Sequence, residues 1–75
     1  MDCKKKLNRS KTGERIYRAI EGSGLNYNQV AEELGLTSPR VIYEWVNGNK
    51  IPSPVRLVNL AALLNVQIED LLVLE

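Results

Sequence analysis

The fold is decided by one stretch of the chain, Gln29-Val30-Ala31-Glu32-Glu33-Leu34-Gly35-Leu36-Thr37 followed by Ser38-Pro39-Arg40-Val41-Ile42-Tyr43-Glu44-Trp45. Apolar residues recur at helical spacing on both sides of Gly35, which predicts two short helices. A glycine suits the corner between them because it takes the left-handed backbone conformation at little cost. We therefore expect a helix, a glycine turn and a second helix.

Both helices also carry a start signal. Asn26 and Gln29 have the spacing of a capping box, and Ser38 followed by Pro39 suits an N-cap and a first helical position. Two short helices joined at a glycine corner form a helix-turn-helix, which presents its second helix to the major groove of DNA. This stretch therefore predicts a helix-turn-helix that ends near Gly48.

Three further helices are predicted around this pair. The first runs from Thr12, as its N-cap, to about Glu21; another follows Ser53 and Pro54 and ends at Asn65; the last covers about 67–73. The expected core residues are Ile16, Ala19, Ile20, Val30, Ala31, Leu34, Ile42, Trp45, Val46, Leu57, Leu60, Ala61, Leu64, Ile68, Leu71 and Leu72. No strand signal is long enough to stand alone. The predicted fold class is all-α, a compact five-helix domain.

Composition argues against several classes of function. The chain has 75 residues, of which 44% are hydrophobic, and this fits one small globular domain. It contains no histidine, the usual general base and commonest metal ligand, and no Cys-x-x-Cys or glycine-rich phosphate loop. No apolar run approaches the length of a membrane span. We expect no enzyme, no catalytic residue, no metal, no cofactor, no small-molecule ligand and no membrane partner.

The single cysteine, Cys3, permits no intramolecular disulfide, and we expect it to be an idle exposed thiol. This cysteine usage fits a reducing compartment, so the expected location is the cytoplasm.

Charge is unevenly distributed along the chain. Residues 1–18 hold seven basic and two acidic residues, a net charge of +5, whereas residues 19–75 hold three basic and seven acidic residues, a net charge of −4. We expect residues 1–10 to be a flexible basic arm and residues 11–75 to be the folded domain. Such an arm either meets an anionic partner or serves only as a solubilising tail.

The order of these features resembles the Cro/repressor, or Xre-like, family of helix-turn-helix domains found in phage repressors and bacterial regulators. The resemblance spans about 12–74. It is carried by Val30-Ala31, Leu34-Gly35, Ile42, Asn47-Gly48, Pro52-Ser53, Leu57, Leu60-Ala61, Leu64 and the ending Val66-Gln67-Ile68-Glu69-Asp70-Leu71-Leu72. Each match alone is weak, but together they occur in the right order and spacing.

The resemblance and the polar side of the second helix imply a DNA-contacting surface. The residues expected to contact bases are Ser38, Arg40, Val41, Tyr43 and Glu44. The residues expected to contact phosphates are Tyr27, Asn47, Asn49, Lys50 and Arg56. Arg40 is the strongest candidate for a base contact because its planar guanidinium fits the O6/N7 edge of guanine. Glu44 either accepts from cytosine N4 or, as the favoured role, holds Arg40 in place. Trp45 is expected in the core.

Three features depart from the family pattern. Tyr27 stands where the family usually has a glutamine that holds a phosphate. Gly35 and Gly48 are separated by one residue more than is usual in the family, and we place the extra residue at Thr37-Ser38. Two alignments that differ by one position therefore remain for the start of the second helix. Ile20 and Val46 replace the arginine–glutamate pair of many members with an apolar pair, which we expect to be at least as stable.

The expected function is therefore sequence-specific binding to double-stranded DNA by a small transcriptional regulator, most simply a Cro-like repressor that acts by occlusion. A weak homodimer is expected by resemblance, with Val73 and Leu74 as its contact. The alternative for these two residues is that they fold back on their own domain. The alternative function is a protein-interaction module, an antitoxin or anti-repressor, which the acidic body of the domain favours.

Overall fold

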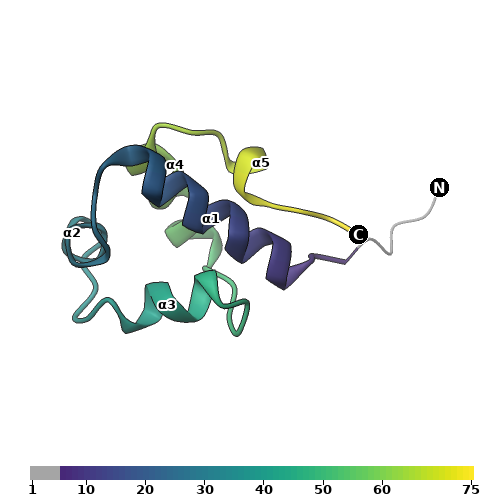
Figure 1. The fold of residues 1–75 in the computed structure, drawn as a ribbon, viewed down its shortest axis with the longest axis horizontal. Coiled ribbons are helices and arrows are strands. Elements are labelled where there is room, and N and C mark those ends of the chain that lie inside the picture. The colour runs from purple at the N-terminus through teal and green to yellow at the C-terminus, as the bar shows by residue number, and fades with distance from the viewer. Residues whose placement is uncertain (1–5) are drawn as a thin grey trace.

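The computed structural model describes residues 6–75 and contains five helices: α1 (Arg9–Ser23), α2 (Tyr27–Glu33), α3 (Arg40–Val46), α4 (Pro54–Leu64) and α5 (Ile68–Leu71). The long helix α1 packs against α3 on one side and against α5 and α4 on the other (Figure 1). The predicted all-α class is confirmed. None of the helices in residues 6–75 has the length and apolar character that a membrane span requires.

The helix-turn-helix is bounded by the signals read from the sequence. The Asn26 side chain accepts from the Gln29 amide at 2.8 Å, and the Gln29 side chain accepts from the Asn26 amide at 2.9 Å, which confirms the capping box. Gly35 has φ 72° and turns the chain after α2. The same left-handed turn recurs after α3 at Gly48 and after α4 at Asn65. Local chemistry therefore sets most of the helix ends.

The predicted start of the first helix was wrong. The helix begins at Arg9, and its N-cap is Asn8, whose side chain accepts from the Lys11 amide at 3.0 Å. Thr12 is instead fully buried, and its hydroxyl accepts from the Val73 amide at 3.0 Å. The sequence does not distinguish a capping threonine from this buried one, because in both roles the hydroxyl accepts a hydrogen bond from a backbone amide.

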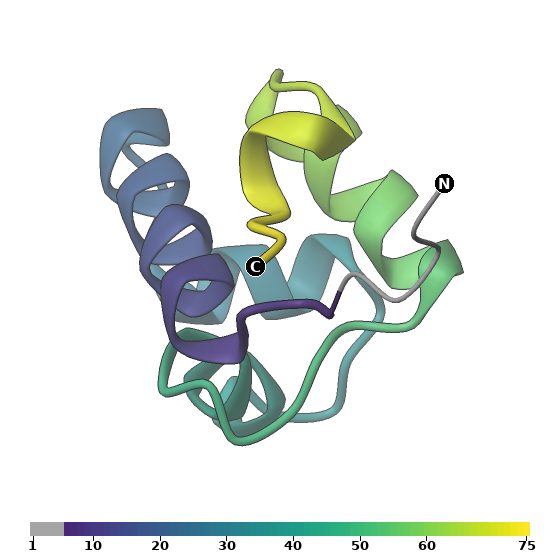
Figure 2. The ribbon, with the colours of Figure 1, turned by 90° about the vertical axis from the view of Figure 1, so that its right-hand side faces the viewer.

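The last helix is also shorter than predicted. It ends at Leu71, and Leu72 is already extended. The chain then runs antiparallel to residues 6–8: the Asn8 amide donates to the Val73 carbonyl at 2.7 Å, and the Glu75 amide donates to the Lys6 carbonyl at 2.8 Å. Figure 2 shows the two terminal segments side by side at the start of α1.

This pairing shortens the predicted arm. Residues 9 and 10 belong to α1, and residues 6–8 lie against the C-terminal segment. The rest of the predicted arm, with Cys3 in it, lies outside the described residues.

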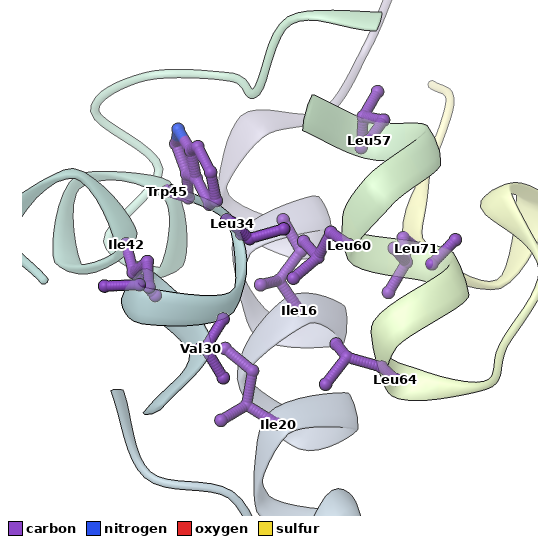
Figure 3. Close-up of a cluster of buried hydrophobic side chains, with 12 residues drawn as sticks. Ile16, Ile20, Val30, Leu34, Ile42, Trp45, Leu57, Leu60, Leu64 and Leu71 are labelled. Carbon is purple, nitrogen blue, oxygen red and sulfur yellow. The ribbon is translucent and has the colours of Figure 1, made fainter. Parts of the chain in front are cut away.

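The core lies between α1 and α4 and receives side chains from all five helices (Figure 3). Its buried apolar members are Ile16, Ile20, Val30, Ala31, Leu34, Ile42, Trp45, Leu57, Leu60, Ala61, Leu64 and Leu71. Every one of them was expected there from helical periodicity. Ile20 is a core residue and Val46 packs against the core, so apolar groups occupy the positions where the resembling family has an ion pair.

Helices α1 and α3 approach each other closely at Gly13. A Cβ atom at this position would lie 2.5 Å from the Trp45 carbonyl oxygen and 2.6 Å from the Val46 carbonyl oxygen. Only glycine therefore lets the end of α3 rest directly on the backbone of α1. This contact fixes α3 in place relative to the rest of the domain.

Candidate nucleic-acid interface

The outward side of α3 carries the residues expected to read bases. Ile42 and Trp45 face the core, whereas Arg40, Tyr43 and Asn47 are exposed. Tyr43 keeps 49% of its surface accessible, a large value for an aromatic residue. Helical spacing of i, i+3 and i+7 places the three exposed side chains on one side of α3. The structure therefore brings them together on the exposed side of α3.

The predicted start of α3 was wrong by one residue: the N-cap is Pro39 rather than Ser38, and the first helical residue is Arg40 rather than Pro39. The Ser38 hydroxyl accepts from the Arg40 amide at 3.1 Å, and the Pro39 carbonyl accepts from Ile42 and Tyr43. Ser38 is exposed and Val41 is half-buried beside it. Ser38 precedes the N-cap and its hydroxyl already accepts one hydrogen bond, so a base contact by Ser38 would have to share that oxygen.

The favoured role of Glu44 was wrong. Its carboxylate lies 3.6 Å from the Lys50 ammonium group, and the ion pairs within residues 6–75 do not include Arg40. The cause is the turn at Gly48: the Asn49 and Lys50 amides both donate to the Glu44 carbonyl, at 3.0 and 3.2 Å. This turn carries Lys50 back over the last turn of α3. Asn49 and Lys50 are both exposed there, next to Asn47.

Arg56 has a partner that the sequence did not suggest. Its guanidinium donates to the Leu34 carbonyl at 2.5 Å, and the side chain is half-buried. Leu34 is the C-cap of α2, so its carbonyl is one of the oxygens a helix end leaves without an intrahelical donor. Arg56 therefore joins the start of α4 to the corner of the helix-turn-helix. The expected phosphate contact of Arg56 remains a proposal. In such a contact the guanidinium would bind the phosphate and the Leu34 carbonyl at the same time.

Substituting Arg56 by methionine is expected to lower the free energy of unfolding by about 1–3 kcal/mol, because the partly buried Leu34 carbonyl loses a charged donor. Thermal unfolding checks this change. Arg9, which is exposed, offers a matched control, and Arg9→Met should stay within about 0.5 kcal/mol of the parent. If Arg56→Met is as stable as Arg9→Met, the hydrogen bond to Leu34 does not hold the corner.

Tyr27 begins α2 and points toward α3 rather than standing alone. Its ring centroid lies 4.7 Å from that of Tyr43, with the planes at 76°, an edge-to-face pair. Partial burial, together with nearby Tyr17, Glu21 and Tyr43, raises the pKa of Tyr27 above its ordinary value. The phenol therefore stays protonated at neutral pH and can donate a hydrogen bond.

The outer side of α1 holds a second group of charges. Lys11, Glu14, Arg15 and Arg18 line a shallow hollow of about 320 Å³ together with Val73. Arg18 pairs with Glu14 at 2.6 Å, and the Arg15 guanidinium donates to the Asp70 carbonyl at 3.4 Å. Two of these three basic side chains, Arg15 and Arg18, therefore already have partners within the domain. No cluster of potential metal ligands occurs among the described residues.

Two residues that shape the surface were missed from the sequence. Gly13 seats α3 on α1, and Thr12 holds the C-terminal segment. A signal for Gly13 was present, because a glycine inside a helix costs about 1 kcal/mol and so often marks a close backbone approach. Thr12 gave no such signal.

Comparison with known proteins identifies the family. A helix-turn-helix family profile matches residues 16–71, about three quarters of the chain. The crystal structure of the restriction-modification controller protein C.AhdI from Aeromonas hydrophila is similar, with a TM-score of 0.74 and 24% identity over 83% of this chain and 92% of that one. A search of curated proteins found no match. The extent of the family match shows that this chain belongs to the helix-turn-helix family of DNA-binding regulators.

Proposed function

We propose that this protein binds double-stranded DNA sequence-specifically, with α3 in the major groove, and acts as a small Cro-like repressor. Occlusion is the simplest mechanism for such a domain, because a protein seated on a promoter blocks other proteins from it. The structural neighbour's role as a controller is compatible with regulation. At its level of identity the likeness concerns the fold, so the proposal does not extend to restriction-modification genes.

The observation that carries the proposal is the exposed side of α3 on a rigid support. Arg40 lies in the first turn of α3, it is exposed, and the ion pairs within residues 6–75 leave it out. The helix beneath it is fixed by Trp45 in the core and by the contact at Gly13. A free guanidinium on a fixed helix is suited to a bidentate contact with guanine.

Arg40→Ala is expected to cost about 1–3 kcal/mol of binding free energy on the preferred duplex and to relax base preference at one position of each half-site. The preferred duplex is obtained by selecting bound sequences from a random pool with the wild-type protein. Affinity is then measured on duplexes that carry each base at each position.

Arg18→Ala is the control for loss of one positive charge away from α3, because Arg18 is exposed on the outer side of α1. It should leave the ranking of bases unchanged. If Arg40→Ala ranks all duplexes as the wild type does, Arg40 does not read a base.

We further propose a weak homodimer through the C-terminal segment, because two half-sites about one helical turn apart increase both affinity and specificity. Leu74 supports this role: it is 56% exposed although it is a large apolar residue. The backbone of Val73 is engaged by its own domain, which favours the alternative in which the segment only folds back. Leu74 is thus the better contact of the two.

Sedimentation of wild type beside Leu74→Asp tests the dimer. The wild type is expected to associate at about micromolar concentration, and the variant to remain monomeric with an unchanged melting temperature. A wild type that is monomeric at high concentration and gains nothing from a second half-site would rule the dimer out.

A second candidate function is a protein-interaction module of the antitoxin or anti-repressor kind. Acidic residues favour it, since Glu32 and Glu33 are exposed on α2 and Glu44 is half-buried on α3. Carboxylates near phosphates are unfavourable, whereas a basic partner protein would gain from them. A module of this kind would bind its protein partner and no duplex.

A further inference from the structure

All three tyrosines of the chain gather at the end of the domain where α1, α2 and α3 meet. Tyr27 packs edge-to-face on Tyr43, with ring centroids 4.7 Å apart. Tyr17 and Glu21 lie close enough to Tyr27 to raise its pKa, and interaction with the Glu21 carboxylate raises the pKa of Tyr17. The chain has no phenylalanine and a single tryptophan, which is in the core. Tyr17 and Tyr43 are exposed, whereas Tyr27 is half-buried.

Tyr27 is held firmly, and Tyr43 is not. The capping box formed by Asn26 and Gln29 fixes the backbone at the start of α2, and the Tyr27 side chain is half-buried. Tyr43 is 49% exposed on the groove-facing side of α3. An exposed side chain on a helix samples several rotamers, and a ring packed on a fixed neighbour keeps one of them. Holding that rotamer beforehand lowers the entropy lost on binding.

The surroundings of Tyr27 favour a role for its aromatic ring rather than a phosphate contact by its hydroxyl. A hollow of about 410 Å³ beside the pair is lined by Ile20, Glu21, Leu25, Asn26, Tyr27, Asn28 and Tyr43. The only ionisable group in this wall other than the phenols is the Glu21 carboxylate. A phosphate near it would meet negative charge, which disfavours the hydroxyl–phosphate contact.

We propose that Tyr27 is a positioning residue that holds the Tyr43 ring for contact with the C5-methyl group of a thymine. This inference rests on the proposed function, because it requires α3 to enter the major groove. The thymine methyl is the one apolar group that base pairs present there, and apolar side chains recognise it. Arg40 then reads a polar base edge, and Tyr43 reads a methyl group one helical turn further along α3.

The experiment replaces each thymine of the selected duplex by deoxyuridine, which removes only the methyl group. Wild type is expected to lose about fourfold in affinity at one thymine of each half-site, the value for one buried methyl group. Tyr43→Ala and Tyr27→Ala should both bind the two duplexes equally. Tyr27→Phe should keep the fourfold difference, because it keeps the ring.

Val41→Ala is the matched control, since Val41 is the other apolar side chain expected near bases on α3. It should keep the penalty at that thymine. The inference is overturned if Val41→Ala abolishes the penalty, or if Tyr27→Phe weakens binding to all duplexes alike, which would mean a hydroxyl–phosphate contact.

Circular dichroism melts confirm that each variant is folded at the temperature of the binding assay. If Tyr27→Ala is unfolded, Tyr27→Leu takes its place, with the same expected loss of discrimination. A wild type that prefers its selected site but treats thymine and deoxyuridine alike at every position overturns this inference alone. A wild type that binds no duplex contradicts the proposed function itself.

Discussion

Replacement of Trp45 by alanine is expected to lower the free energy of unfolding by about 3–5 kcal/mol, which is the usual cost of emptying a buried aromatic site. Trp45 is 3% exposed and lies among the core side chains of α1, α2 and α4 (Figure 3). A domain this small has a total stability of only about 5–15 kcal/mol, so the loss removes a large part of it. Chemical denaturation at 25 °C measures the change.

Tyr43→Ala is the control, because it removes an aromatic ring from the opposite side of the same helix. Its cost should be below about 1.5 kcal/mol, the value of an aromatic pair. The contrast separates a core aromatic from one that serves the surface. A Trp45→Ala variant that keeps wild-type stability and changes only its base preference would show that the indole belongs to the DNA-contacting surface.

The second large effect is expected at Gly13. Gly13→Ala places a methyl group 2.5 and 2.6 Å from two backbone carbonyl oxygens of α3, distances that no Cβ atom tolerates. Helix α3 must then move away from α1, and we expect a cost of about 3 kcal/mol, the upper end of the range for overpacking. Alanine's higher helix propensity, about 1 kcal/mol, does not offset this. Because α3 shifts, affinity for DNA should also fall.

The same helix offers a matched control in Gly22, where a Cβ atom would meet nothing within 4 Å. Gly22→Ala is expected to stabilise the domain by about 0.5–1 kcal/mol, since it removes only the conformational freedom of glycine. Thermal melts of the two variants should therefore move in opposite directions. Two shifts of the same sign would mean that α3 does not rest on Gly13.

The sequence was most informative where structure depends on nearby residues. The capping box at Asn26, the corner at Gly35 and the cap at Ser53 each involve residues within a few positions of one another, and all were predicted correctly. Helical periodicity likewise identified the core, because a residue's side of a helix follows from its spacing alone. These features were enough to define the helix-turn-helix.

The remaining features depend on contacts between distant residues. The pairing of residues 6–8 with Val73 and Glu75 joins the first and last segments of the described residues, and the hydrogen bond from Arg56 to Leu34 spans 22 positions. Lys50 reaches Glu44 only because the turn at Gly48 directs it there. Such contacts follow from the packed arrangement of the helices, so the roles of Arg56, Glu44 and Thr12 were not readable from spacing.

The most direct test of the central claim is a salt titration of duplex binding, carried out on the selected site and on a scrambled duplex of the same length. We predict that both affinities fall steeply with salt, by about 0.9 in the logarithmic slope for each phosphate that a lysine or arginine neutralises, and that the selected site binds roughly a thousandfold more tightly than the scrambled one. Failure to bind either duplex at low salt, or equal affinity for both, would contradict sequence-specific recognition through α3.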